Sequence, residues 1–135
     1  MDLDHRQNAL LLARGRALNG LVMLAVPGLV GRVLFGKQGS QPVTKALVRL
    51  VGIRDLVLGV GAITTVKEHT MDAEWVGVGA VADAVDGVVA LAARGLPARS
   101  RLIALMGGGA AVVGTLAARA LADDRAATVA SEIDS

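Results

Sequence analysis

The sequence predicts an all-α fold, an integral membrane antiparallel four-helix bundle, and three observations favour it. Hydrophobic residues make up 53% of the 135 residues and charged residues only 19%, below the roughly 25% of soluble domains. Phe35 and Trp75 are the aromatic residues, whereas 17 glycines accompany much Ala, Val and Leu, and small residues let helices pack closely in a bilayer. Several apolar runs are long enough to cross about 30 Å of hydrocarbon. The alternative is a soluble helical bundle.

The first expected span covers residues 17–35 of what we expect to be a single transmembrane domain, residues 1–135. Pro27 and Gly28 in its middle predict a kink. Basic residues before the run resemble the start of a signal peptide, but no small-x-small cleavage site follows. We therefore expect a retained helix that begins after Arg16.

Three further spans are expected at residues 45–66, 75–93 and 102–121. A cluster of Gly, Ser and Pro at residues 36–44 separates the first span from the second. The second span is the least apolar, because it contains an Arg-Asp pair, and the third opens on a Trp at the place of an interfacial anchor. A polar, acidic tail, residues 123–135, is expected to be frayed.

The charge and residue content exclude several classes of function. The net charge of +2 comes with no basic stripe interleaved with aromatics, so we expect no nucleic-acid partner. The chain has no cysteine, which excludes disulfides and thiolate metal sites. His5 and His69 stand far apart without a second ligand at metal spacing, so we expect no metal site and no cofactor. The expected partner is the lipid bilayer.

The expected location is the plasma (inner) membrane, with several spans. Orientation follows the Lys and Arg of short loops. The loops 36–44 and 94–101, with their flanks, carry Arg32, Lys37, Lys45, Arg49, Arg94, Arg99 and Arg101. The opposite side carries Arg6, Arg14, Arg16, Lys67, Arg119 and Arg125. The small difference favours the two loops on the cytoplasmic side.

Four ionisable residues are expected to share a layer near the middle of the membrane: Arg54, Asp55, Asp83 and Asp86. Counted from helix ends on the same side, Arg54 and Asp83 lie about 17 Å deep. A buried charge in lipid needs a partner, so we expect Arg54 to pair with Asp83 or Asp86, with Asp55 or a protonated carboxyl completing the group. Three acids beside one arginine make a site for a proton or cation; the alternative is a structural salt bridge that sets helix pairing.

Small residues recur on the helix faces that carry these acids. Residues three and four apart share a face, and on the second and third helices the acidic face is also the small-residue face. We expect the following glycines to serve helix packing: Gly52, Gly59, Gly87, Gly107 and Gly114. A phosphate-binding loop at the Gly-rich start of the fourth helix is disfavoured, because no strand precedes it and no Lys-Ser/Thr follows. Asn19 is expected to hydrogen-bond across helices.

Two segments resemble a known pattern. Residues 52–59 read G-I-R-D-L-V-L-G, and residues 82–87 read A-D-A-V-D-G. Together they resemble an uncharacterised family of small four-helix membrane proteins from bacteria and fungi, with the pattern G-x-R-D-L-x-L-G followed by D-x-x-D-G. The resemblance covers the second and third expected helices and implies a four-helix bundle without an assigned activity. More loosely, the chain is similar to DoxX-like membrane proteins, but no motif carries a quinone or oxidoreductase role onto a residue here.

Three functions remain open from the sequence. The first is binding or transport of a proton, cation or small polar ligand at the Arg/Asp group, in a homo-oligomer. The second is an accessory or scaffold subunit of a larger membrane complex, in which the charges set helix pairing. The third is an intramembrane acid-base enzyme acting on a lipid or isoprenoid. No catalytic residue can be named, and the sequence leans away from an enzyme.

Overall fold

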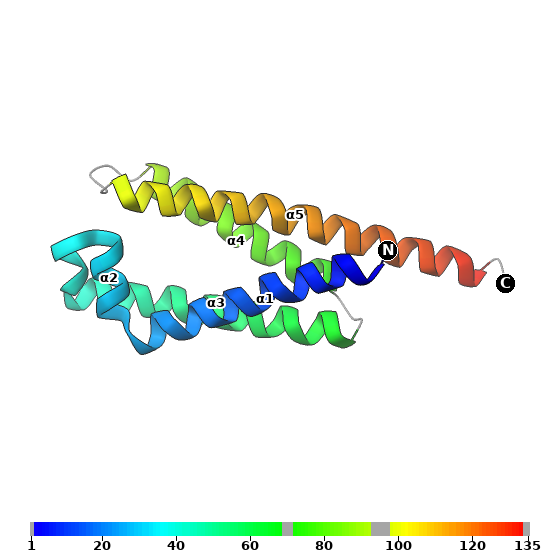
Figure 1. Ribbon diagram of the computed structural model, residues 1–135, viewed down its shortest axis with the longest axis horizontal. Helices are drawn as coiled ribbons and strands as arrows, with labels where there is room; N and C mark the ends of the chain where they lie inside the picture. Colours follow the sequence, from blue (N-terminus) through cyan, green and yellow to red (C-terminus); the bar gives the residue numbers. More distant parts are fainter. Residues whose placement is uncertain (1, 69–71, 93–97, 134–135) are drawn as a thin grey trace.

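The part of the chain that the structure, a computed structural model, describes is all-helical, which confirms the all-α part of the predicted fold class (Figure 1). It describes residues 2–68, 72–92 and 98–133, apart from the side chains of residues 2–5, 99, 101 and 103–108. This part of the chain forms five α-helices and one short 3₁₀ helix, η1. They are α1 (Asp2–Ala25), α2 (Pro27–Phe35), η1 (Gly36–Ser40), α3 (Pro42–Glu68), α4 (Asp72–Ala92) and α5 (Ala98–Ile133).

The four long helices form two antiparallel pairs. α1 packs along α3, and α4 packs along α5 (Figure 1). The pairs are joined to each other by contacts between α3 and α4 and between α1 and α5. The helices thus alternate in direction along the chain, while α2 and η1 lie at one end of the α1–α3 pair (Figure 1).

The first helical region differs from the span expected at residues 17–35. α1 already begins at Asp2, and the chain turns by 101° between α1 and the segment that starts at Pro27. Pro27 has no N–H to donate and its ring clashes with the preceding turn, and Val26 leaves the helical region with φ −129° and ψ 52°. The proline therefore separates two helices where a kink in a single span was expected.

The segment after α2 folds back against α2. Gly36 ends α2 with φ 66°, a left-handed conformation that glycine adopts without strain. The backbones of Gly31 and Gly39 then touch, so that neither position has room for a side chain. Most of the expected loop at residues 36–44 is consequently helical, as η1 and the first turn of α3.

Glycines bring α1 and α3 into backbone contact. A Cβ atom on Gly52 would lie 2.8 Å from the Cβ of Met23 and 3.0 Å from the carbonyl oxygen of Gly20. A Cβ on Gly59 would lie 2.8 Å from the carbonyl oxygen of Ala13. Real Cβ atoms do not approach so closely, so two of the expected packing glycines lie where α3 meets α1.

The remaining expected packing glycines lie on α4 and α5. A Cβ on Gly114 of α5 would lie 3.1 Å from the Cβ of Ala80 on α4, so Gly114 belongs to the contact between these two helices. Gly87 is buried on α4. The surroundings of Gly107 lie outside the described residues.

The apolar core is small and lies toward the end of the molecule where α1 begins. Its buried members come one from each long helix: Ala9, Val66, Val76 and Leu121. Leu10, Ala73, Ala117 and Ala118 pack against them. This end of the bundle is where the two helix pairs share a common core.

The C-terminal segment is not frayed as expected for residues 123–135. α5 continues as a helix to Ile133, and residues 134–135 lie outside the described part. Arg125 in this segment forms ion pairs with α4, which gives the helix a tertiary contact that its polar composition does not reveal.

Within the described residues, α4 by itself is long and apolar enough to cross a membrane. The stretch from Arg6 to Ser40 passes the same test if its two bent parts are counted as one span. This is fewer than the four spans expected. The second span is interrupted by Arg54 and Asp55, and the fourth includes residues 103–108, whose side chains are not described.

Candidate functional site

Five charged residues from three helices meet in the middle of the molecule, and we call them the central cluster. They are Arg16 of α1, Arg54 and Asp55 of α3, and Asp83 and Asp86 of α4. The structure thus brings the four ionisable residues expected from the sequence into one network. It adds Arg16, which we had placed outside the membrane.

Arg54 binds Asp86, one of the two partners expected for it. Its Nη1 donates to Oδ1 of Asp86 at 2.7 Å and its Nη2 to Oδ2 at 2.6 Å. Nη2 also donates to Oδ1 of Asp55 at 2.9 Å. Two parallel N–H···O bonds between a guanidinium and a carboxylate are the strongest geometry for such a pair. Arg54 therefore joins α3 firmly to α4.

Arg16 joins α1 to the other two helices of the cluster. It donates to Asp83 through Nη2 in a short ion pair and to Asp55 through Nη1 at 3.4 Å. Nη2 also donates to the carbonyl oxygen of Gly79 at 3.1 Å. The guanidinium carbon would lie 3.5 Å from a Cβ on Gly79, so the arginine lies directly against α4 at this position.

Asn19 completes the hydrogen bonding of Asp55, as the sequence led us to expect for a bond between helices. Its Nδ2 donates to Oδ2 of Asp55 at 3.0 Å. Asn19 follows Arg16 by three residues, so both side chains leave α1 on the same side. This spacing, next to the small buried Ala13 and Gly20, is the signal that could have identified Arg16 as a site residue.

The central cluster grades from buried to exposed. Asp55 is 7% exposed, the side chain of Asp83 is 17% exposed and that of Asp86 is 46% exposed. Nε of Arg54 is buried and makes no hydrogen bond within the described residues. Two guanidinium groups face three carboxylates, so the cluster carries a formal charge of −1. The sequence analysis expected three carboxylates beside one arginine, which is a more negative group.

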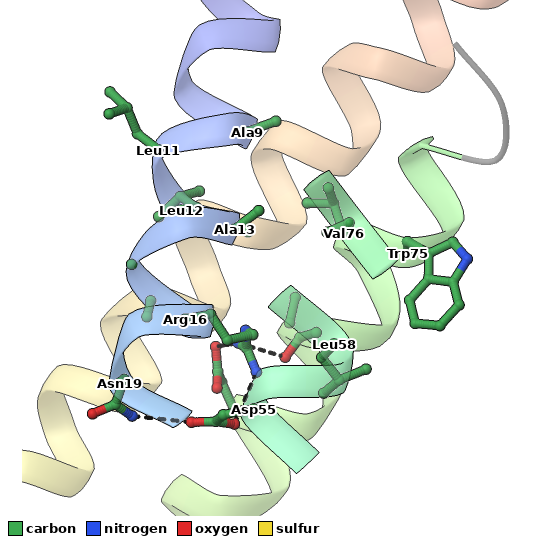
Figure 2. Close-up of a pocket in the computed structure, with 17 residues that line it drawn as sticks. Ala9, Leu11, Leu12, Ala13, Arg16, Asn19, Asp55, Leu58, Trp75 and Val76 are labelled. Atoms are coloured by element: carbon green, nitrogen blue, oxygen red, sulfur yellow. Dashed lines mark hydrogen bonds and ion pairs between the residues drawn. The ribbon is translucent and has the colours of Figure 1, made fainter. Parts of the chain in front are cut away.

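A partly open cavity of about 600 Å³ lies beside the cluster, between the two helix pairs. Its polar lining residues are Arg16, Asn19, Asp55 and Asp83, whereas Arg54 and Asp86 do not line it. The rest of the lining is mainly apolar and comes from α1, α3, α4 and α5. Figure 2 shows Arg16, Asn19 and Asp55 close together, with Leu12 and Ala13 of α1 beside them.

Trp75 lies on the α3–α4 side of this cavity. A Cβ on Gly61 would lie 2.6 Å from the indole ring, so the glycine provides the flat surface on which the ring packs. In Figure 2 the indole points away from Arg16. The ring thus forms part of the apolar wall and does not contact the polar residues of the central cluster.

A second group of charges, which we call the terminal cluster, lies near the apolar core. Asp72 is 2% exposed, forms an ion pair with Arg6 at 3.3 Å and accepts a hydrogen bond from Nη2 of Arg125 at 3.0 Å. Arg6 also donates to the carbonyl oxygen of Val66 at 3.0 Å, and Arg125 lies 3.4 Å from Glu74. The sequence pattern missed this cluster, because Asp72 falls between the second and third expected spans and Arg125 falls in the tail that was expected to be frayed.

Among the described residues, no group of three His, Cys, Asp or Glu side chains is arranged to hold a metal ion. The side chain of His5 and the whole of His69 lie outside those residues. Each carboxylate of the central cluster pairs with at least one arginine. The site is therefore an ion-pair network beside a cavity.

No protein-family model matches this chain, and no curated protein or solved structure was found to be similar to it. The resemblance of residues 52–59 and 82–87 to a family of small membrane proteins stays a prediction. The function must therefore be inferred from the site.

Proposed function

We propose that α1, α3, α4 and α5 span a lipid bilayer and that the cavity beside the central cluster binds a small amphipathic molecule. The outer surface supports the first part. Large apolar side chains point outward from every long helix, among them Leu18, Leu21, Leu47, Val57, Val81, Val88 and Leu116. The interior holds mainly Ala, Gly, Val and the charged clusters. In a bilayer these outward side chains contact hydrocarbon, whereas in water they would form a large exposed apolar surface.

The depth of the charges is consistent with this placement. Arg6 and Arg16 are about 15 Å apart along α1, so the terminal cluster lies near one membrane surface and the central cluster near the middle. Charges at that depth need partners, and Arg54 and Asp55 in α3 both have them. The pairing reduces the main obstacle to a span at residues 45–66.

Oligomerisation becomes a proposal with this placement. The partly exposed Arg54–Asp86 pair lies on the outer surface at mid-membrane depth, and a homo-oligomer would cover it. Cross-linking in native membranes should give dimers.

The orientation in the membrane is a second proposal. The end that holds α2 and η1 carries Lys and Arg without Asp or Glu, which favours loops 36–44 and 94–101 on the cytoplasmic side. A cytoplasm-only reporter fused to the C-terminus should then be inactive.

The chemistry of the cavity indicates which polar group it takes. Its walls are mainly apolar, and its volume falls within the roughly 300–1,000 Å³ of small-molecule sites. Oδ1 of Asp83 and Oδ1 of Asn19 receive no hydrogen bond from the described residues, so acceptors remain available. Together with the formal charge of −1, these acceptors favour a positive or hydrogen-bond-donating head group on an apolar body. The excess negative charge is the observation that carries the proposal.

Probes of equal length and different charge test the site. The protein in detergent or nanodiscs is titrated with decylammonium, decanol and decanoate, and binding is followed by calorimetry. Decylammonium should bind at least about tenfold more tightly than decanoate, because like charges in a desolvated site repel strongly. Asp83→Asn makes the cluster neutral and should remove most of this preference.

Asp123→Asn is the matched control. Asp123 is exposed on α5 and does not line the cavity, so this variant should keep the preference. Equal affinity of the native protein for all three probes would contradict the proposed ligand class. A protein that leaves the membrane fraction in an alkaline carbonate wash would contradict the membrane placement.

A further inference from the structure

The end of the molecule that holds α2 and η1 carries a second hollow. Arg32, Gly36, Lys37 and Ser40 line an open space of about 410 Å³ there. None of these residues belongs to the central cluster or lines its cavity. The hollow is therefore separate from the site proposed above.

Local backbone contacts hold this hollow in shape. Gly36, in its left-handed conformation, turns the chain, and the contact between Gly31 and Gly39 holds η1 against α2. Nε of Arg32 donates to Oγ of Ser40 at 2.6 Å. This bond fixes the plane of the guanidinium group, and its two terminal nitrogens make no hydrogen bond within the described residues. Arg32 thus presents a free pair of donors at the rim.

The charge at this end is unbalanced. The sequence contains no Asp or Glu between Asp4 and Asp55, and neither Arg32 nor Lys37 forms an ion pair with a described residue. At the opposite end, Arg125 is paired with Asp72. Arg32 and Lys37 therefore have no carboxylate partner among the described residues, and their charges are available to an anion from outside the chain.

We propose that this hollow binds the phosphate group of an anionic phospholipid. The terminal nitrogens of Arg32, the ammonium of Lys37 and the hydroxyl of Ser40 supply several donors around one space, and a planar guanidinium matches the oxygens of a phosphate. Basic pockets at membrane surfaces bind lipid head groups in this way. The choice of a lipid phosphate rests on the membrane placement proposed above, which puts α2 and η1 at head-group level.

The test uses the full chain in a neutral detergent and two short-chain lipids, dioctanoyl phosphatidylglycerol and dioctanoyl phosphatidylcholine. The native protein should bind the phosphatidylglycerol at least about tenfold more tightly. The double variant Arg32→Gln, Lys37→Gln should bind it about 30-fold more weakly than the native protein, the effect of removing two cations. The double variant should still bind decylammonium, since the central cavity is unchanged.

Two single variants separate a built site from general surface charge. Arg49→Gln removes one positive charge from exposed α3 near the same end and should weaken phosphatidylglycerol binding by less than about fivefold. Arg32→Lys keeps the charge but loses the planar donor pair, and should weaken binding by about tenfold. If Arg32→Lys binds phosphatidylglycerol as the native protein does, or if Arg49→Gln weakens binding as much as Arg32→Lys does, the proposal is wrong.

Inorganic phosphate separates the two sources of the anion. At the same concentration it should displace little of the lipid, since the lipid adds apolar contacts that inorganic phosphate lacks. Displacement by phosphate as efficient as by the lipid would overturn the assignment to a phospholipid.

Discussion

The terminal and central clusters use the same residue types in opposite ways. Around Asp72, two arginines face two carboxylates, and the aspartate is 2% exposed next to the apolar core. In the central cluster, two arginines face three carboxylates, and the network opens into a cavity. A balanced, closed network mainly holds helices together, whereas an unbalanced, open one leaves charge available for a ligand. The comparison separates a structural role from a binding role within one fold.

The largest expected effect is at the terminal cluster. Asp72→Asn leaves Arg6 and Arg125 without their shared carboxylate at the point where all four long helices meet. Breaking a buried ion pair costs about 3–5 kcal/mol, and because both arginines are partly exposed we expect the lower end, about 3 kcal/mol. Chemical unfolding in detergent measures this loss. The exposed Asp123→Asn should change the unfolding free energy by less than about 1 kcal/mol. An equally small change for Asp72→Asn would show that the terminal cluster does not have the structural role assigned to it.

Arg16→Gln should have an intermediate effect. It removes the ion pairs from α1 to Asp55 and Asp83 and leaves Arg54 alone against three carboxylates. We expect a loss of about 2 kcal/mol, less than for Asp72→Asn, because the cavity lets water reach the carboxylates that are left. Arg14→Gln, on the exposed side of the same helix, is the control and should change the unfolding free energy by less than about 0.5 kcal/mol. If Arg16→Gln has an equally small effect, the ion pairs of Arg16 do not stabilise the fold, and the expected order of the two clusters is wrong.

The smallest effect on stability is expected for Asp83→Asn. The change makes the central cluster neutral and keeps a polar side chain beside Arg16, so the unfolding free energy should change by less than about 1 kcal/mol. The same variant should lose the preference for decylammonium. If it destabilises the protein as much as Asp72→Asn does, the central cluster is a structural network like the terminal one.

Local pattern predicted much of the secondary structure and part of the site. A bend at Pro27 follows from the missing N–H of proline, although a kink within one span was expected and the chain instead forms two helices there. The acidic, small-residue faces of α3 and α4 follow from helical periodicity, and the structure places Asp55, Asp83 and Asp86 on neighbouring faces with Arg54. These features depend on residues within two or three turns of one another.

Arg16, Arg6 and Arg125 could not be placed by the same reasoning. Hydropathy assigned all three to the ends of spans or beyond them, because an unpaired arginine is costly in lipid. Each pairs with a carboxylate from another helix, and this pairing stabilises a position that is at least partly removed from solvent. Their partners lie far away in the sequence, so no local pattern points to them.

The sequence by itself determined the all-helical class, a bend at Pro27 and the helix faces that carry small residues and acids. Only the tertiary structure decided that Arg16 joins the central cluster and that Arg54 binds Asp86 while Asp83 lines a cavity. It also decided that Asp72 pairs with Arg6 and Arg125 near the apolar core. Helix formation and periodicity are set by neighbouring residues, whereas ion pairing and cavities depend on which helices meet and at what height.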